Sequence, residues 1–163
     1  MEPIIRKREE KDLKELAHNI AVIWNDTYKG IVDQDFLDGL YEHESDSYER
    51  MKKHLETQPD FYILELNNKI IGWIYFENQS EHESDAGEIH SLYVLKEYHG
   101  MGYGKLLYNF AKDKLKARGL NKMVIGCLNG NPSNDFYKHM GGVNFKTNLW
   151  RNKYLENLYL FKI

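Results

Sequence analysis

Hydrophobic positions recur along this chain at two spacings, one typical of helices and the other typical of strands. Residues 4–8 are a candidate first strand, and helical spacing from Asp12 then predicts an amphipathic helix. The polar stretch 25–30 is expected to end that helix, and Asp33 is a candidate N-cap for a second one. Apolar residues of the helices expected in this first third of the chain are Leu13, Leu16, Ala17, Ile20, Ile23, Trp24, Phe36, Leu37, Leu40, Tyr48, Met51 and Leu55.

The central part of the chain changes to strand patterns. Residues 61–66 and 69–76 are apolar runs joined by Asn67-Asn68, which predicts an antiparallel hairpin. Residues 88–94 form another apolar run, and a helix with one apolar face follows it, formed by Leu106, Leu107, Phe110, Ala111 and Leu115. A strand over 122–128 comes next, so we expect a parallel β-α-β crossover.

The last part of the chain predicts a short helix and a hairpin. Asn131 is expected to cap a helix that begins at Pro132 and carries Phe136, Tyr137 and Met140. Residues 145–150 and 154–161 then read as two strands with many aromatic residues. Since an apolar edge strand must be covered, a homodimer that forms through this hairpin is one possibility. With no repeat or linker, residues 1–163 are expected to form a single domain.

Composition narrows the classes of protein that the chain can be. It has no apolar run of about 18 residues and no secretory leader, so we expect a soluble cytoplasmic protein with no membrane partner. A net charge of −3 and a pI near 6.2 argue against a nucleic-acid partner. The single cysteine, Cys127, lies in an apolar strand and is expected to be a buried structural thiol. Seven histidines show no paired ligand spacing, so no metal is predicted.

The stretch from His99 to Lys105 has a glycine at every second position, between a predicted strand and a predicted helix. Glycine permits a tight turn and close approach of a ligand, and the free N–H groups of a first helical turn bind anions. A dinucleotide fingerprint would need glycine at Lys105, and a Walker loop would need glycine at His99 and a hydroxyl at Leu106. The remaining interpretations are another phosphate site and a turn that only lets strand and helix pack closely.

The order of these elements resembles the GCN5-related N-acetyltransferase (GNAT) superfamily over nearly the whole chain. The most specific block is the run 88–94 followed by H-G-M-G-Y-G, which is close to the family's strand and its [QR]-x-x-G-x-[GA] turn. A second block, N-P-S-N-D-F-Y with Gly141-Gly142, is similar to the family's asparagine, FY and glycine sequence. The resemblance implies an α/β (α+β) fold with a mixed, mostly antiparallel sheet of six to seven strands. It also implies a central β-α-β crossover and helices on both faces.

Two positions depart from the family pattern. His99 stands where the family usually has Gln or Arg; it can donate a hydrogen bond to a phosphate but carries no assured charge. Six positions separate Asn131 from Tyr137, against seven in the commonest form, so alignment on Phe136-Tyr137 puts Gly130 at the usual asparagine place. The contact of Asn131 with a cofactor therefore stays open.

The resemblance implies acetyl-CoA as co-substrate. Its pantetheine amides would pair with the backbone of Leu92 and Val94, as an added strand does. Its pyrophosphate would meet the N–H groups from Gly100 to Lys105, where the helix dipole favours negative charge. The implied cofactor-binding residues are Leu92, Tyr93, Val94, His99, Gly100, Met101, Gly102, Tyr103, Gly104, Lys105, Asn131 and Tyr137.

The resemblance also implies direct attack by an amine on the thioester in a ternary complex. An ammonium must first lose its proton, and Glu88 matches a position where many family members carry a glutamate that acts through water. His90, two residues on, lies on the same strand face. Tyr137 matches the family's tyrosine that assists the leaving thiolate. An ordinary strand-end carboxylate at Glu88 and a packing role for Tyr137 are the alternatives.

The acceptor is the least determined part of the prediction. Trp24, Tyr28, Glu88 and His90 are candidate substrate-binding residues. Acidic residues gather over 42–49 and 81–88, which favours a small cationic amine such as a polyamine, although a solvated acidic face explains them too. A peptide or protein amino group remains an alternative acceptor. The alternative function is a non-catalytic acyl-CoA-binding sensor or interaction module.

Overall fold

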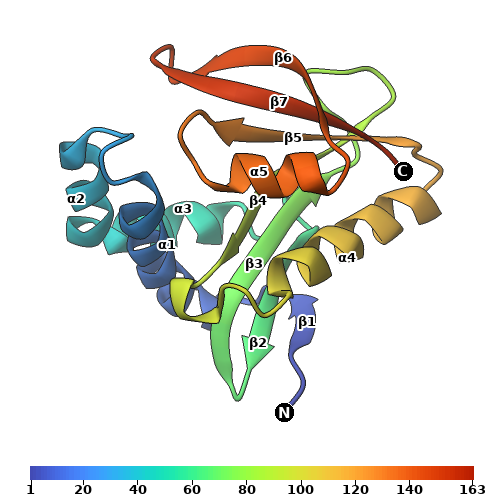
Figure 1. The fold of residues 1–163 in the computed structure, drawn as a ribbon. Coiled ribbons are helices and arrows are strands. Elements are labelled where there is room, and N and C mark those ends of the chain that lie inside the picture. The colour runs from blue at the N-terminus through green and yellow to red at the C-terminus, as the bar shows by residue number, and fades with distance from the viewer. The chain divides into compact units, whose positions relative to one another are not determined.

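The computed structural model describes all residues 1–163 and contains a single sheet of seven strands (Figure 1). The strands are β1 (Ile4–Lys7), β2 (Phe61–Leu66), β3 (Lys69–Glu77), β4 (Gly87–Val94), β5 (Lys122–Leu128), β6 (Val143–Trp150) and β7 (Tyr154–Lys162). Their order in the sheet is β1-β2-β3-β4-β5-β7-β6. The β4–β5 pair is parallel, whereas β1–β2, β2–β3, β5–β7 and β6–β7 are antiparallel, so the predicted mixed sheet is confirmed.

Five α-helices and two short 3-10 segments connect the strands. The helices are α1 (Leu13–Tyr28), α2 (Gln34–Glu42), α3 (Glu44–Lys53), α4 (Tyr103–Ala117) and α5 (Ser133–His139), and the 3-10 segments are η1 (Glu10–Asp12) and η2 (Lys96–Tyr98). Since α4 follows β4 and precedes the parallel strand β5, the predicted β-α-β crossover is confirmed. None of these helices combines the length and the apolar content that crossing a bilayer requires.

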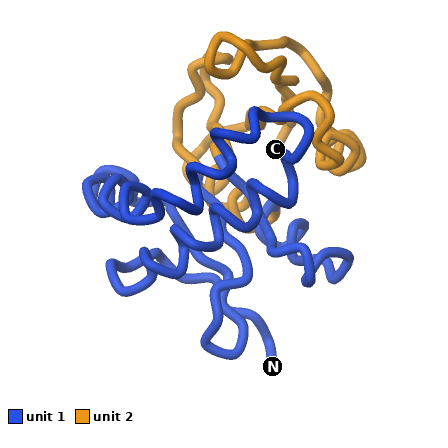
Figure 2. Tube along the Cα trace, turned by 90° about the vertical axis from the view of Figure 1, so that its left-hand side faces the viewer, with its two compact units in different colours: residues 1–75, 91–108 blue, residues 76–90, 109–163 orange.

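The chain divides into two compact units, coloured blue and orange in Figure 2. Unit 1 comprises residues 1–75 and 91–108, and unit 2 comprises residues 76–90 and 109–163. The chain passes from one unit to the other within β3, within β4 and within α4, so each of these elements contributes residues to both.

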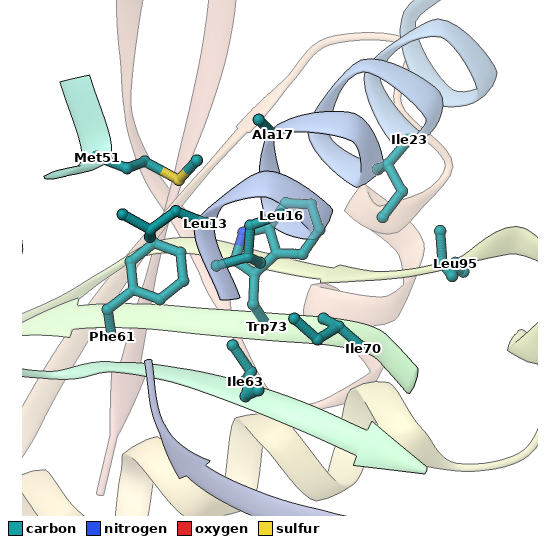
Figure 3. Close-up of a cluster of buried hydrophobic side chains, with 10 residues drawn as sticks. All are labelled: Leu13, Leu16, Ala17, Ile23, Met51, Phe61, Ile63, Ile70, Trp73 and Leu95. Atoms are coloured by element: carbon teal, nitrogen blue, oxygen red, sulfur yellow. The ribbon is translucent and has the colours of Figure 1, made fainter. Parts of the chain in front are cut away.

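The core of unit 1 forms where α1 lies on the sheet, as Figure 3 shows. Leu13 and Leu16 on α1 are fully buried and belong to the same cluster as Ile63 of β2 and Trp73 of β3. The helical spacing of the apolar residues on α1 therefore produces the expected buried face.

Two polar contacts attach α1 to the edge of this core. Asn19 donates a hydrogen bond from Nδ2 to the Ile70 carbonyl at 3.0 Å, and Glu15 accepts one from the Ile70 N–H at 2.7 Å. Both backbone groups of Ile70 are thus satisfied by side chains from the helix. These contacts fix the position of the β2–β3 hairpin against α1 within unit 1.

The first helix ends within the predicted stretch 25–30, at Tyr28. Asn25 is accommodated because its Nδ2 donates to the Ala21 carbonyl at 2.8 Å and to the Leu37 carbonyl at 3.0 Å. Because the Asn25 side chain bonds to these carbonyls, it does not compete with the helix backbone, and the helix continues to Tyr28. The last turn brings Tyr28 onto the same helix face as Trp24.

The β2–β3 hairpin has the turn that its sequence predicts. Asn67 and Asn68 have φ angles of 52° and 63°, the left-handed values that a two-residue hairpin turn requires. Further along β3, a Cβ on Gly72 would lie 2.6 Å from the Tyr93 carbonyl oxygen. Glycine at this position therefore permits the close approach of β3 and β4.

In unit 2, β5 pairs with β4 on one side and with β7 on the other. Leu115 of α4 packs over Gly87, where a Cβ would lie 2.8 Å from the leucine side chain. The buried face of α4 consists of Leu107, Tyr108, Ala111 and Leu115, but Leu106 is 40% exposed, so its predicted place on that face was wrong. The final hairpin of β6 and β7 is confirmed.

Candidate active site

The glycine turn lies in unit 1, between β4 and the first residue of α4. Gly100 and Gly102 have φ angles of +79° and +84°, and a Cβ on either glycine would meet no atom within 4 Å. These glycines are therefore required by backbone conformation and not by close packing of strand and helix. The first N–H groups of α4 follow at once and have no partner within the helix. The turn thus presents backbone donors at a positive helix end, as an anion site does.

His99 links this turn to the end of β4. Its Nε2 lies 2.8 Å from the Val94 carbonyl oxygen, so this nitrogen carries a hydrogen and donates it to the strand. The Val94 carbonyl therefore already has a partner within the chain. Only Nδ1 of the His99 ring is left to face a ligand, and it can donate to a phosphate only when the ring is protonated.

An aromatic cluster in unit 1 surrounds Tyr93 of β4. We define it as Trp24, Tyr28, Phe36, Trp73 and Tyr93. The Tyr93 ring centroid lies 5.4 Å from that of Trp73 and 6.3 Å from that of Trp24. The two tyrosine hydroxyl oxygens are 2.9 Å apart, and the Trp24 ring lies 4.5 Å from Tyr28 and 5.8 Å from Phe36. The predicted residues Trp24 and Tyr28 are thus brought together with the predicted Tyr93.

Glu88 is the second residue of β4 and belongs to unit 2. It is only 9% exposed, and the Ser80 hydroxyl donates a hydrogen bond to its Oε1 at 2.5 Å. Ser80 is itself fixed, because its Oγ accepts from the His82 N–H at 3.0 Å and its N–H donates to the Ala86 carbonyl at 2.8 Å. Ser80 was not among the predicted residues, and its place in a polar segment without periodicity offers no signal for it.

His90 connects Glu88 with a second carboxylate. Its Nδ1 lies 3.2 Å from Glu88 Oε2, and its Nε2 lies 2.9 Å from Glu77 Oε1 at the end of β3. Glu88 and His90 share a face of β4, as their spacing of two predicts. Glu77 was not among the predicted residues. No group of three or more His, Cys, Asp and Glu side chains in the chain is arranged to hold a metal ion.

Tyr137 and Asn131 lie at α5 in unit 2. Tyr137 is buried, and its ring centroid is 5.4 Å from Phe136 and 6.1 Å from Tyr159 of β7. Asn131 is also buried, and its Oδ1 accepts a hydrogen bond from the Ser133 N–H at 2.8 Å. The side-chain oxygen of Asn131 thus satisfies the first N–H of α5, which begins at Ser133 and not at Pro132 as predicted, with Pro132 in the N-cap position.

Asn134 fixes the position of α5, and sequence reasoning did not single it out. Its Nδ2 donates to the Leu128 carbonyl at 2.9 Å, while its Oδ1 accepts from the Tyr159 hydroxyl at 2.7 Å and from Asn157 Nδ2 at 3.1 Å. One side chain therefore joins α5 to both β5 and β7. This anchoring holds the helix that carries Tyr137.

Cys127 does not form part of a nucleophilic site. It is buried in β5, and burial raises the pKa of its thiol to about 12, with a smaller contribution from the charge of Glu156. A thiol with that pKa is almost entirely protonated near neutral pH, so it cannot act as an acyl-accepting thiolate. The prediction of a buried structural thiol is confirmed.

A family model described as the acetyltransferase (GNAT) family matches residues 20–142. The chain belongs to the GNAT family. It is an acetyl-CoA-dependent N-acetyltransferase of that family, and the resemblance on which the expected fold rests is confirmed. The matched residues include parts of both compact units, and the single domain over 1–163 stays a prediction.

Individual proteins agree with this membership. The chain is 27% identical over 135 residues to the uncharacterized N-acetyltransferase YuaI of Bacillus subtilis, an alignment that covers 82% of this chain and 76% of the relative. Its fold is similar to that of the PaiA N-acetyltransferase from Thermoplasma acidophilum in complex with coenzyme A, with a TM-score of 0.78, 21% identity and 100% of each chain covered. A GNAT acetyltransferase from Streptococcus pneumoniae has a TM-score of 0.71 and 22% identity, with 99% of each chain covered.

Proposed function

We propose that this GNAT enzyme transfers the acetyl group of acetyl-CoA to the primary amino group of a small cationic amine, by direct attack in a ternary complex. The observation that carries the proposal is Glu88, a buried carboxylate that is held by Ser80 and contacts His90. A carboxylate fixed in this way is suited to accept a proton from an acceptor ammonium, directly or through a water molecule.

The donor is held by the turn and by the end of β4. The N–H groups from Gly100 to Lys105 bind the pyrophosphate, supported by the left-handed glycines and the helix end. The backbone from Leu92 to Val94 pairs with the pantetheine amides, although the Val94 carbonyl must share or release its bond to His99. Holding the thioester beside the amine in a productive geometry can remove about 7–11 kcal/mol from the barrier.

The chemical step removes two protons from the nitrogen, and one proton is taken up at the sulfur. Glu88 takes a proton from the ammonium, and the amine lone pair then attacks the thioester carbonyl to form the C–N bond. The C–S bond breaks, and the Tyr137 hydroxyl donates a proton or a hydrogen bond to the departing thiolate. A second proton leaves the new amide nitrogen as the tetrahedral intermediate collapses and, directly or through water, replaces the proton that Tyr137 gave to the thiolate.

The aromatic cluster supports a cationic acceptor. Aromatic faces attract alkylammonium groups, and Trp24 and Tyr93 are only partly buried. Unit 1 also carries negative charge around Tyr41: burial raises the pKa of Tyr41, and the carboxylates of Asp26 and Glu44 raise it further. An amine with a positive charge at each end, such as a polyamine, fits this combination better than a neutral amino sugar does.

The test measures thiol release from acetyl-CoA with a panel of polyamines, amino sugars, amino acids and N-terminal peptides. We expect the highest kcat/KM with a polyamine or diamine, and product mass should rise by one acetyl group. Equal rates with neutral and cationic amines would refute the acceptor class. Tight acetyl-CoA binding with no acetylated amine across the panel would refute turnover and favour the acyl-CoA sensor.

Tyr137→Phe tests the role of the hydroxyl. We expect kcat to fall about 10- to 10⁴-fold, because general acid assistance is lost, while the dissociation constant for acetyl-CoA stays the same. Tyr154→Phe, in β7 of the same unit, is the matched control and should leave kcat unchanged. An unchanged kcat in Tyr137→Phe would remove this residue from the mechanism.

A further inference from the structure

His90 lies between two carboxylates in unit 2, and each of its ring nitrogens faces one of them. Nδ1 is 3.2 Å from Glu88 and Nε2 is 2.9 Å from Glu77. A neutral imidazole has one N–H and one lone pair, so one of the two carboxylates faces a lone pair. With its hydrogen on Nε2, the ring faces the closer carboxylate, Glu77, with the N–H group and faces Glu88 with the lone pair of Nδ1. Adding one proton between Nδ1 and Glu88 converts this unfavourable contact into a hydrogen bond.

The exposed fraction of the side chain increases from Glu88 through His90 to Glu77. The Glu88 side chain is 11% exposed, that of His90 is 30% exposed and that of Glu77 is 52% exposed. A carboxyl group that takes a proton in every turnover must also lose it in every turnover. Glu88 has little contact with water and one of its oxygens is occupied by Ser80, so direct release to solvent is restricted. The imidazole offers a path to a carboxylate that water reaches freely.

We propose that His90 and Glu77 relay the acceptor's proton from Glu88 to solvent, and that Ser80 holds Glu88 in line for this transfer. The relay rests on the role of Glu88 in the proposed function. It assigns to Glu77 and Ser80 a part in turnover without contact with either substrate, so both are positioning residues.

The transfer conserves protons at each step. Protonated Glu88 gives its O–H proton to His90 Nδ1, and the ring becomes an imidazolium with one N–H toward each carboxylate. The Nε2–H bond then breaks, Glu77 takes that proton and passes it to water, and Glu88 is again a carboxylate. The ring, left with hydrogen on Nδ1, returns to its first tautomer by exchange with water at its exposed side.

The experiment compares Glu77→Gln with the wild type under saturating acetyl-CoA and amine, at fixed pH and ionic strength. Glutamine keeps the size and a hydrogen-bonding oxygen but cannot take up the proton. At low buffer concentration we expect kcat to fall about tenfold, less than the 10²- to 10⁴-fold expected for loss of the base itself. KM for both substrates should stay within about twofold, because neither substrate contacts Glu77. Raising the concentration of an imidazole buffer should restore kcat, because the buffer removes the proton in place of Glu77.

Two further variants separate the possible outcomes. Asp113→Asn removes an exposed carboxylate from α4 in the same unit and should show neither the loss nor the rescue by buffer. Glu88→Gln should lose activity that no buffer restores. A wild-type kcat in Glu77→Gln, or a reduced kcat that does not respond to buffer, would overturn the relay while Glu88 remains the base. An unchanged kcat in Glu88→Gln would instead refute the base assignment, and with it the starting point of the relay.

Discussion

Gly72→Ala tests whether the close approach of β3 and β4 in unit 1 depends on the absence of a side chain. The new Cβ would lie 2.6 Å from the Tyr93 carbonyl oxygen and 3.3 Å from the Val94 Cα. Cβ atoms in real structures essentially never approach another heavy atom closer than 3.0 Å, so the strands must separate by at least 0.4 Å, the difference between 3.0 and 2.6 Å. The obstacle is backbone and not the tip of a flexible side chain, so it cannot rotate away.

This displacement is comparable to overpacking in a core, which costs about 1–3 kcal/mol. In a chain of this length each kcal/mol shifts the melting temperature by about 2–4 °C, so we expect a decrease of about 2–12 °C. Tyr93 and Val94 belong to the strand that we propose to pair with pantetheine, so KM for acetyl-CoA should rise as well. Thermal unfolding, urea unfolding and steady-state kinetics measure these three effects.

Gly39→Ala provides the matched control, because the same methyl group is added in the same unit. Gly39 lies within α2, and its nearest atom, His43 Cδ2, is 3.9 Å from the ideal Cβ, an ordinary contact. Alanine here should stabilise the protein by up to about 1 kcal/mol through helix propensity. Equal unfolding free energies for the two variants would refute the argument that Gly72 permits the strand spacing.

Two predictions concern groups with shifted pKa values. Because burial raises the pKa of the Cys127 thiol to about 12, Ellman's reagent should not react with the native protein near neutral pH and should react fully in urea, and Cys127→Ala should keep its kcat. Rapid reaction of the native thiol would contradict this burial. For Asp12, burial raises the carboxyl pKa, but hydrogen bonds lower it by more, so the pKa lies below its ordinary value of 3.8. The donors are Arg6, at 2.8 and 2.9 Å, and the Glu9 N–H, at 2.7 Å. The stabilisation by Asp12 is therefore present above pH 3.8 and lost as pH falls through the lower folded value, so Asp12→Asn should cost about 1–3 kcal/mol at neutral pH and less in acid. A cost that urea unfolding finds independent of pH would contradict the assignment.

Much of the fold could be predicted from the sequence because it is specified by neighbouring residues. Asn67 and Asn68 favour the left-handed conformation, and the alternation on either side of them sets the hairpin register. The glycines at positions 100 and 102 do the same for the turn before α4. In each of these places the decisive interactions lie within a few residues along the chain.

Prediction from the sequence is weakest where the surroundings of a side chain come from residues that are distant along the chain. The stretch 25–30 ends α1 as expected, but the helix includes Asn25 because its side chain bonds to the Leu37 carbonyl on α2. Leu106 was expected on the buried face of α4, but the helix buries Tyr108 together with Leu107, Ala111 and Leu115 and leaves Leu106 exposed. Periodicity cannot resolve either case, because it records which residues are apolar and not which surface they meet.

The difference between local and distant interactions also separates acetyl-CoA binding from the handling of the acceptor's proton. The residues proposed to bind acetyl-CoA lie close together in one turn, with glycines at positions 100, 102 and 104. Binding a pyrophosphate through backbone N–H groups requires this local backbone geometry. Handling of the acceptor's proton requires only that some path to water exists, so its residues follow no shared spacing. Glu77 and Ser80 lie 11 and 8 positions before Glu88, in a strand end and a polar connection, and only the fold brings them to it. A sequence motif can therefore identify the donor, whereas the acceptor's proton path must be read from the contacts of Glu88 and His90.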